Sequence, residues 1–330
     1  MKRSFRFLLV MPPAFCRQNL STVRSRQAVG FISALLFSGV FSTCAAQGYL
    51  EGVNVSNELM PMEVKNSTVD HAFYGNNLRI NDFIPVFLKK DKSEYLVFGL
   101  NLESLNFTGT HPDFPVTGIY SISPVLGYSR RINSQLNLSA LLIPLLNSDL
   151  EEVQSSDIHF GGVIRGAYHI SENFAVKLTV GYRKQYYGPQ YIVLVGLDWK
   201  LSDKWRLFGE MPTYATLSYS LTPKMNAGAS YLSGNTSYRL SAQDHYLQYL
   251  FAQPGLFIEY YITPIIALRT TVAYAVERNM DIYNMSDKIN GGVIDHIDLG
   301  PKTTPLNMEV ATGPAFKLSL SLRVPEPKNK

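Results

Sequence analysis

Apolar and polar residues alternate along most of the chain with a period of two. The clearest example is the segment 316–324, where every second residue is Phe, Leu or Val and the residues between are Lys, Ser or Arg. The same alternation covers residues 94–104, 136–142, 158–170, 174–183, 191–201 and 266–276. A period of two is typical of a β-strand with one apolar face. The pattern predicts 12 strands, and 14 if residues 50–57 pair at the start.

The connections between the predicted strands alternate between short and long. Short ones, such as residues 171–173, 202–204 and 222–224, are polar and contain the turn-forming residues Asn, Asp, Ser and Pro. The long ones cover residues 108–117, 147–157, 234–246 and 279–310. Outer-membrane barrels of bacteria have the same asymmetry, with short periplasmic turns and longer outer loops.

The second face of the strands distinguishes a membrane barrel from a soluble protein. It mixes small residues, such as Ala175, Gly181 and Ala273, with charges of both signs, as side chains in the lumen of a barrel do. A soluble secreted β-sandwich or β-barrel, the alternative, would carry mostly Lys, Glu and Thr on this face. The charged residues that we expect to face the lumen are Arg165, Lys177, Arg183, Asp198, Arg206, Glu210, Glu259, Arg269, Glu277 and Lys317.

Aromatic residues gather near the ends of the predicted strands. Trp199 and Trp205 flank the turn 202–204, where an interfacial girdle would lie. Strands that cross lipid must also close into a ring, because unpaired backbone groups in hydrocarbon are costly. We therefore predict an all-β fold, a closed antiparallel up-and-down transmembrane β-barrel of 12–14 strands over residues 70–324. Residues 47–69 are expected to be an N-terminal extension or the first strand, and residues 325–330 a C-terminal tail.

Residues 1–46 have the pattern of a signal peptide. Arg24 and Arg26 precede an apolar run over residues 28–41, and small residues follow it. Cleavage is expected after Ala46. The alternative is a retained membrane anchor, although the run is shorter than the ~20 apolar residues of a spanning helix. The segment predicts export to the bacterial outer membrane.

The same segment accounts for the basic charge of the chain. The net charge is +4, but residues 1–46 contain six basic residues and no acidic one, which leaves 24 basic and 26 acidic residues in the rest. That balance gives no indication of nucleic-acid binding. Both cysteines, Cys16 and Cys44, also lie in this segment. The exported chain is therefore expected to lack disulfides, thiol nucleophiles and thiolate metal ligands.

The exported region resembles bacterial outer-membrane β-barrel proteins. More narrowly, it is similar to an uncharacterised family of such barrels that is known only as a domain of unknown function. The resemblance rests on residues 191–221, which contain the turn Leu-Ser-Asp-Lys-Trp, and on residues 256–274, where Thr-Pro joins two strands. It covers about residues 70–330 and implies a fold and a location rather than an activity. One departure is the end of the last strand at Val324, where such barrels commonly carry an aromatic residue.

Three functions fit such a barrel. The first is a channel or binding barrel for small molecules, and the second is a structural or surface-interaction barrel with a filled lumen. The third is an outer-membrane hydrolase that uses Asp295, His296 and Asp298 in the longest connection. We favour the first, and we expect a solvated loop over 279–310 without enzymatic activity, cofactor or metal. The expected partners are outer-membrane lipids, the barrel-assembly machinery and a small solute.

Two further sets of polar residues are expected to be structural. Ser241, Asp244 and His245 have the residue types of a catalytic triad, but they are neighbours in sequence, whereas such groups usually come from separate segments. His159 and His169 fall on the inward face of one predicted strand and are expected to form hydrogen bonds in the lumen. The alternation does not specify cross-strand register. It therefore leaves open whether the inward charges pair with neighbours or sort by sign onto opposite walls.

Overall fold

The computed structural model describes residues 49–68, 72–109 and 111–325, all within one compact unit, Cys44–Lys330. Two 3₁₀-helices, η1 (Ser155–Asp157) and η2 (Ser241–Gln243), are the helical segments in these residues. No helix in this part of the chain is long and apolar enough to cross a membrane. The strands are β1 (Tyr49–Met62), β2 (Phe73–Asp82), β3 (Ile84–Phe87), β4 (Glu94–Thr108), β5 (Gly118–Arg131), β6 (Leu136–Ser148), β7 (Ile158–Ser171), β8 (Phe174–Gln185), β9 (Gly188–Lys200), β10 (Trp205–Met211), β11 (Tyr214–Thr222), β12 (Met225–Leu240), β13 (His245–Thr263), β14 (Ile266–Ala275), β15 (Glu277–Asn284), β16 (Val293–Ile294), β17 (Ile297–Asp298) and β18 (Gly313–Pro325).

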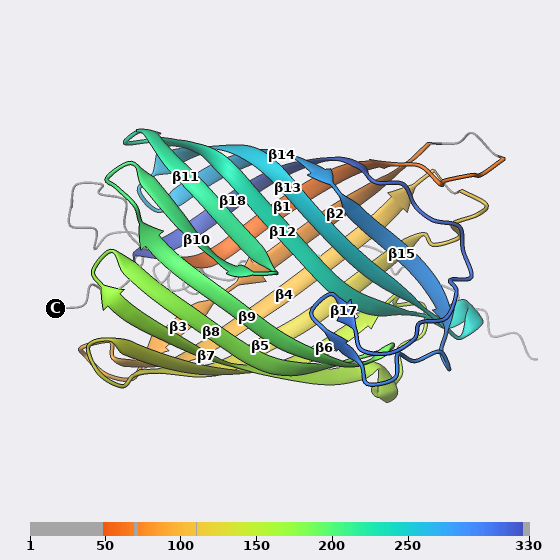
Figure 1. Cartoon of the computed structure of the whole chain (residues 1–330), viewed down its shortest axis with the longest axis horizontal. Helices are drawn as coiled ribbons and strands as arrows, with labels where there is room; N and C mark the ends of the chain where they lie inside the picture. The colour runs from red at the N-terminus through yellow and green to blue at the C-terminus, as the bar shows by residue number, and fades with distance from the viewer. Residues whose placement is uncertain (1–48, 69–71, 110, 326–330) are drawn as a thin grey trace, which may run out of the picture. The chain divides into compact units, whose positions relative to one another are not determined.

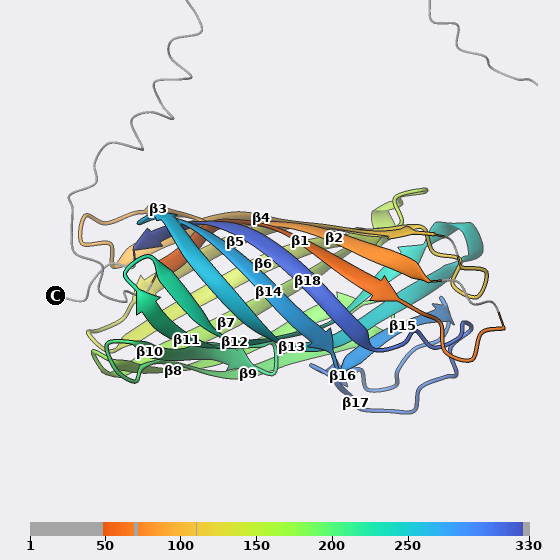
Figure 2. The same ribbon diagram turned by 90° about the horizontal axis from the view of Figure 1, so that it is seen from above.

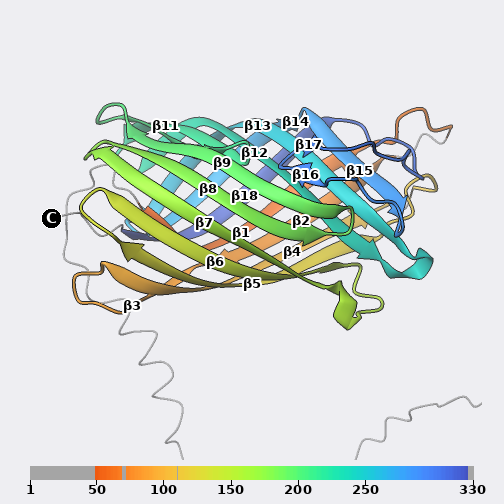
Figure 3. The same cartoon turned by 60° about the horizontal axis from the view of Figure 1, so that its bottom comes forward.

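The strands form a closed ring in which neighbours in the wall are antiparallel (Figures 1, 2 and 3). The ring closes where β1 pairs with β18, from Tyr49 opposite Pro325 to Leu59 opposite Phe316. Two wall positions hold a strand broken in two, because β2 and β3 both pair with β4, and β14 and β15 both pair with β13. The wall therefore has 14 strands, and the predicted fold class is confirmed. Residues 49–62, which the sequence left as an extension or a first strand, form β1.

The alternation in the sequence separates an apolar exterior from a mixed interior. On β18, Leu318 and Leu320 are 52% and 46% exposed, whereas Ser319 and Ser321 are 5% and 3% exposed. Large apolar side chains are exposed in the same way on the other long strands of the wall except β12. In a transmembrane barrel this belt is the surface that faces lipid.

The two ends of the barrel differ in their connections. Short turns such as 172–173, 202–203 and 264–265 lie at the end where β1 begins and β18 ends, which we call the turn end (Figure 2). The long connections lie at the other end, the loop end. At the turn end, Trp199 and Trp205 are half exposed on either side of one turn, and the ring centres of Trp205 and Tyr219 are 4.7 Å apart. Such aromatic residues are typical of a membrane interface.

The lumen is filled at the loop end. There the sheet β12–β13–β15 presents Leu247, Tyr249 and Phe251 to the interior, and these side chains pack in one cluster with residues from β1, β2, β4 and β5. The resulting cluster, the loop-end core, contains 16 buried residues: Met60, Met62, Val64, Phe73, Leu105, Phe114, Val116, Ile119, Tyr238, Leu247, Tyr249, Phe251, Met280, Ile282, Val310 and Ala315. The end of β12 also reaches β6, with Arg239 opposite Ser148.

The wall is interrupted near the loop end by a short hairpin. β10 pairs with β9 only between Met211, opposite Val195, and Arg206, opposite Lys200. β11 pairs with β12 only as far as Leu232. Beyond these points no strand of the ring lies between β9 and β12. The small hairpin β16–β17 from the connection after β15 occupies this place (Figure 1), and β16 pairs with β9 in parallel.

Candidate functional site

The turn-end half of the lumen is a cavity of about 690 Å³, which we call the lumen cavity. It reaches the rim at the turn end, where Glu172, Asn173 and Lys200 line it. Further in, its walls combine apolar side chains such as Phe83 and Leu141 with many charged and amide groups. Most of these groups come from the inward positions of the alternating strands, so the pleat of the sheet itself places them there.

Ion pairs between neighbouring or nearby strands hold most of the charged side chains in place. The pairs and their nitrogen–oxygen distances are Arg165–Glu210 (2.8 Å), Arg206–Asp198 (2.5 Å), Arg269–Glu259 (2.8 Å) and Arg323–Glu259 (2.6 Å). Register explains the third pair, because Glu259 on β13 lies directly opposite Arg269 on β14. The charges therefore pair along the wall rather than sorting by sign onto opposite sides.

Basic groups remain in excess after this pairing. Seven basic side chains line the cavity against three carboxylates. Three more carboxylates lie beside the lining: Glu210 and Glu259, which are buried directly behind it, and Asp203, which pairs with Lys200 at the rim. Lys177 projects from β8 into the cavity, and no acidic group in the described residues forms an ion pair with it. In general, an excess of positive charge along a lumen favours small anions over small cations.

A buried polar network separates the lumen cavity from the loop-end core. Arg79 on β2 donates a hydrogen bond from Nε to Glu103 at 2.8 Å, and its Nη1 lies 3.6 Å from Glu58, which lines the cavity. The hydroxyl of Tyr238, itself part of the core, donates to Glu103 at 3.1 Å. The network links β1, β2, β4 and β12 across the lumen. Together with the core it closes the straight path along the barrel axis.

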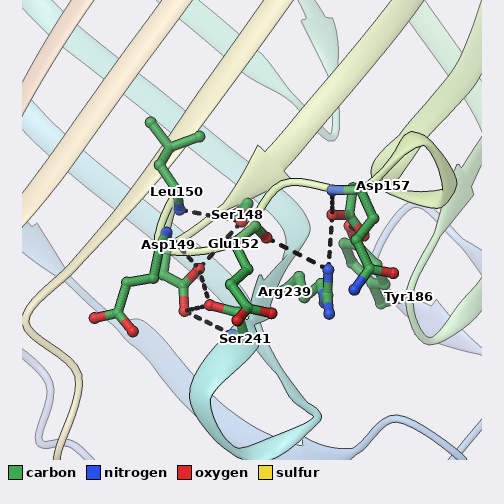
Figure 4. A network of polar contacts seen from close by, with 10 residues as sticks. Ser148, Asp149, Leu150, Glu152, Asp157, Tyr186, Arg239 and Ser241 are labelled. Carbon is green, nitrogen blue, oxygen red and sulfur yellow. Dashed lines mark hydrogen bonds and ion pairs between the residues drawn. The ribbon is translucent and has the colours of Figure 1, made fainter. Parts of the chain in front are cut away.

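Polar contacts also tie the loop-end mouth together (Figure 4). Arg239 at the end of β12 donates to the Asp157 carboxylate at 2.9 Å and to the backbone oxygen of Glu152 at 3.4 Å. The Asp149 carboxylate accepts bonds from the backbone N–H and the hydroxyl of Ser241, at 2.6 and 2.8 Å. These bonds fasten the β12–β13 hairpin to the connection between β6 and β7.

The gap between β9 and β12 is bridged by side chains and by residues 289–298, which we call the seal. Arg183 on β8 donates to the backbone oxygen of Asn235 at 2.9 Å, which reaches across to β12. In the seal, Ile289 and Val293 are buried, and the Asp295 N–H donates to the backbone oxygen of Tyr191 at 3.0 Å. Burial raises the pKa of the Asp295 carboxyl above its usual value.

The structure distributes the predicted lumen residues over four environments. Six of them line the lumen cavity: Arg165, Lys177, Asp198, Arg206, Arg269 and Lys317. Glu210 and Glu259 are buried behind the lining as partners of the arginines. Arg183 bridges to β12 beside the gap. Glu277 lies on a different face.

The expectation that Glu277 faces the lumen is wrong. The pairing of β13 moves from Gly255 opposite Ala273 to Ala252 opposite Glu277, so the strand that includes Val276 contains one extra residue. Such a bulge reverses the faces of all residues after it. Glu277 therefore shares the face of Ala252, whereas Gln253, the next residue of β13, lines the cavity.

The expectation of a solvated loop over 279–310 is wrong for most of its first half. Residues up to Asn284 belong to β15, and Val293 is fully buried in the seal. The residues of the alternative hydrolase function, Asp295, His296 and Asp298, do not share one set of contacts. The Asp295 carboxylate accepts the N–H of Val193 at 3.3 Å, while Asp298 is exposed. No group of three or more His, Cys, Asp or Glu side chains in the described residues could hold a metal ion.

The remaining histidines, His245, His159 and His169, form no catalytic arrangement with the residues around them. Ser241 donates its hydroxyl to Asp149 and not to His245. His159 is buried, with its ring centre 4.6 Å from that of Tyr186, and His169 lines the lumen cavity. Both histidines of β7 face inward, as their spacing predicted.

Several charged residues of the interior are not among the expected lumen residues. Glu103 and Arg323 lie inside the alternating segments 94–104 and 316–324, on their polar face, so the alternation itself identifies them. Glu58 lies in β1, where the alternation is interrupted by polar residues on the outer face. Arg278, which donates to the backbone oxygens of Pro61 and Pro314, follows the bulge and gave no signal.

Comparison with known proteins gives one family match and several similar folds. A family model described as "Domain of unknown function (DUF6268)" matches residues 90–288. No curated protein matches the chain in sequence. The COG4313 outer membrane channel from Pseudomonas putida F1 is 10% identical, with 87% of this chain and 100% of that chain covered and a TM-score of 0.41. The P. putida toluene transporter TodX is 9% identical (84% and 90% covered, TM-score 0.39), and the NanC porin is 8% identical (83% and 100% covered, TM-score 0.35).

Proposed function

The chain belongs to the family described as "Domain of unknown function (DUF6268)", and we propose that it is a gated outer-membrane channel for small anionic solutes. The observation that carries this proposal is the lumen cavity, whose basic lining remains in excess after ion pairing. A cavity of about 690 Å³ lies within the size range of small-molecule sites. Since the loop-end core blocks the axis, passage requires a movement of the protein.

The location in the outer membrane follows from the same proposal. A closed barrel with an apolar belt needs lipid around it, and bacterial barrels of this kind lie in the outer membrane. The signal peptide expected over residues 1–46 falls outside the described residues and would be removed after Ala46. On this orientation the turn end faces the periplasm, and the lumen cavity opens there. Outer-membrane lipids and the barrel-assembly machinery are the proposed partners.

A second candidate is a structural or surface-interaction barrel. The loop-end core favours it, because 16 buried residues fill the lumen at that end. We propose that the protein has no enzymatic activity, since the Asp295 carboxylate accepts a backbone hydrogen bond from β9 whereas Asp298 is exposed.

Reversal potentials in planar bilayers under a KCl gradient test the channel. We expect anion-selective openings for the protein and a shift toward cation selectivity for Lys177→Glu, because the variant replaces a cation in the cavity by a carboxylate. Lys90→Glu, a matched change in the exposed turn between β3 and β4, should leave the reversal potential unchanged. Absence of openings in the correctly folded protein would favour the filled structural barrel.

A further inference from the structure

The gap in the barrel wall offers a second path out of the lumen. Residues 188–194 of β9 pair with β8 on one side, but on the other side they have no neighbour in the ring, because β10 begins to pair only at Val195. On the other side of the gap, β12 likewise has no neighbouring ring strand beyond Ser233. The Ser233 N–H still donates to the backbone oxygen of Thr213 at the tip of the β10–β11 hairpin. Such unpaired backbone groups need other partners, since a barrel wall in lipid cannot leave them exposed.

The lumen cavity extends to the edge of this gap that lies nearer the turn end, at the tip of the β10–β11 hairpin. Tyr214 at the tip of the β10–β11 hairpin and Leu232 on β12 both line it. Tyr231 also lines the cavity, although it pairs with Pro254 on the outward face of β13. The cavity therefore borders β12 at the last residues that pair with β11, next to the gap.

Backbone bonds of ordinary length attach the seal to the start of β9, from the Ile289 N–H to the Tyr187 oxygen at 2.9 Å and from the Asp295 N–H to the Tyr191 oxygen at 3.0 Å. Its other hydrogen bonds to β9 and β12 involve side chains and are long. The backbone oxygen of Asp295 accepts side-chain bonds from Gln190 at 3.4 Å and from Asn235 at 3.2 Å, and the Asp295 carboxylate accepts the Val193 N–H at 3.3 Å. Bonds of this length are weak. Neither ring nitrogen of His296 has a hydrogen-bond partner in the described residues, although both are buried. The polar attachment of the seal is therefore confined to a few backbone bonds with β9, and its side-chain contacts, including those to β12, add little.

The alternative path along the axis is much more firmly closed. It would require the 16 residues of the loop-end core to separate and the pairs of Arg79 with Glu58 and Glu103 to break. Displacing the seal instead separates Ile289 and Val293 from four buried tyrosines, Tyr186, Tyr187, Tyr246 and Tyr283. It also breaks the two-residue pairing of β16 with β9 and the bond from Arg183 to Asn235, but it leaves the pairing between the wall strands themselves intact. Because the hydrophobic effect scales with buried apolar area, the seal costs far less to move.

We propose that the barrel opens sideways, through the gap between β9 and β12, when the seal (residues 289–298) lifts away from β9. The inference rests on the proposed channel function, and it names the moving segment and the route. The opening lies at the level of Tyr191, whose exposed ring belongs to the aromatic residues near the loop end. Solutes in the lumen cavity would pass beyond the tip of the β10–β11 hairpin, between β9 and β12, without crossing the loop-end core.

Two neighbouring glycines provide a matched pair of variants. Gly291 and Gly292 both have φ of +82°, so alanine is strained at either position. A Cβ atom at Gly292 would lie 2.2 Å from the backbone oxygen of Pro189 on β9, whereas one at Gly291 would meet the Leu299 side chain at 3.4 Å. Gly292→Ala should therefore push the seal off β9, and Gly291→Ala should leave it in place.

Access to the lumen is measured with Ser230→Cys, which places a thiol in the lumen cavity near the gap. Beyond residue 46 the chain has no cysteine. A maleimide dye too bulky for general porins is added to intact cells. We expect at least a tenfold faster labelling when Ser230→Cys is combined with Gly292→Ala than when it is alone or combined with Gly291→Ala. Equal labelling in all three folded proteins overturns the proposal.

An axial variant and a disulfide lock complete the test. Leu247→Ala, which loosens the loop-end core, should not increase labelling; if it does so while Gly292→Ala does not, the route is axial and the proposal is wrong.

In the pair Tyr191→Cys and Ile294→Cys, which face each other across β9 and β16, oxidation should abolish the openings and reduction should restore them. Openings that persist in the oxidised pair also overturn the proposal. If Gly292→Ala speeds labelling but no channel openings are recorded for the folded protein, the result supports the moving seal and contradicts only the channel function.

Discussion

Glu259 shows how one buried carboxylate organises the wall of the lumen. It is 1% exposed and accepts bonds from two arginines, Arg269 on the neighbouring strand β14 and Arg323 on β18. Two cations on one carboxylate keep both guanidinium groups near the wall. The cavity therefore stays open between them, and its charge is set by the groups that remain, above all Lys177.

Glu259→Gln should destabilise the barrel strongly. Breaking a buried ion pair by removing one partner costs about 3–5 kcal/mol, because an uncompensated charge stays behind. We expect a loss of this size in the free energy of unfolding, measured by urea titration of the protein in liposomes.

Asp203→Asn is the matched control for this prediction. Asp203 pairs with Lys200 at 2.8 Å, but its side chain is 97% exposed, and such pairs contribute about 0–1 kcal/mol. An equal effect of both substitutions would contradict the assignment of Glu259 as the anchor of the two arginines.

At the scale of single elements, the period-two pattern accounts for most of the interior. On β8, Leu178 and Val180 face outward while Lys177 and Thr179 face the lumen, as the alternation predicts. The pattern failed after Val276, because a bulge depends on cross-strand pairing and leaves no mark in the alternation of one strand. It also did not reveal that β10 and β11 are too short to reach the loop end.

The two faces of β8 should respond differently to the same substitution. Leu178→Arg places a charge on the lipid face, where an arginine near the bilayer midplane costs about 2–4 kcal/mol. Ala175→Arg puts it in the lumen cavity opposite Asp198 on β9, where a carboxylate is close. We expect a reduced fraction of folded, heat-modifiable protein in outer-membrane preparations for Leu178→Arg alone. Comparable yields for both variants would argue against a lipid-facing exterior.

At the scale of the whole molecule, the connection after β15 consists of two parts with different packing. Residues 289–298 close the wall gap with Ile289 and Val293 buried, whereas most residues between 299 and 309 are exposed. The same length of chain therefore contains a sealing element and a solvated loop.

Limited proteolysis of intact cells should distinguish these two parts. We expect proteinase K to cut within residues 299–309 and to leave residues 289–298 uncut, because cleavage needs a locally unfolded segment and the buried residues Ile289 and Val293 hold the seal in place. Mass spectrometry of the released and retained fragments identifies the cleavage sites, and the barrel should remain heat-modifiable after cleavage. First cuts within 289–298 would show that the seal does not pack on β9. Gly292→Ala should make that segment susceptible.

The sequence by itself determined the strand pattern, the lipid-facing belt and the inward position of most charged residues, because each depends on alternation within one strand. The alternation alone places Arg206 and Lys177 on the inward face. Only the tertiary structure decided which charges pair, since cross-strand register brings Glu259 to Arg269. The tertiary structure also showed the filled loop end and the gap between β9 and β12. Both result from the relative lengths and bending of strands far apart in the chain, and these depend on packing across the barrel rather than on local pattern.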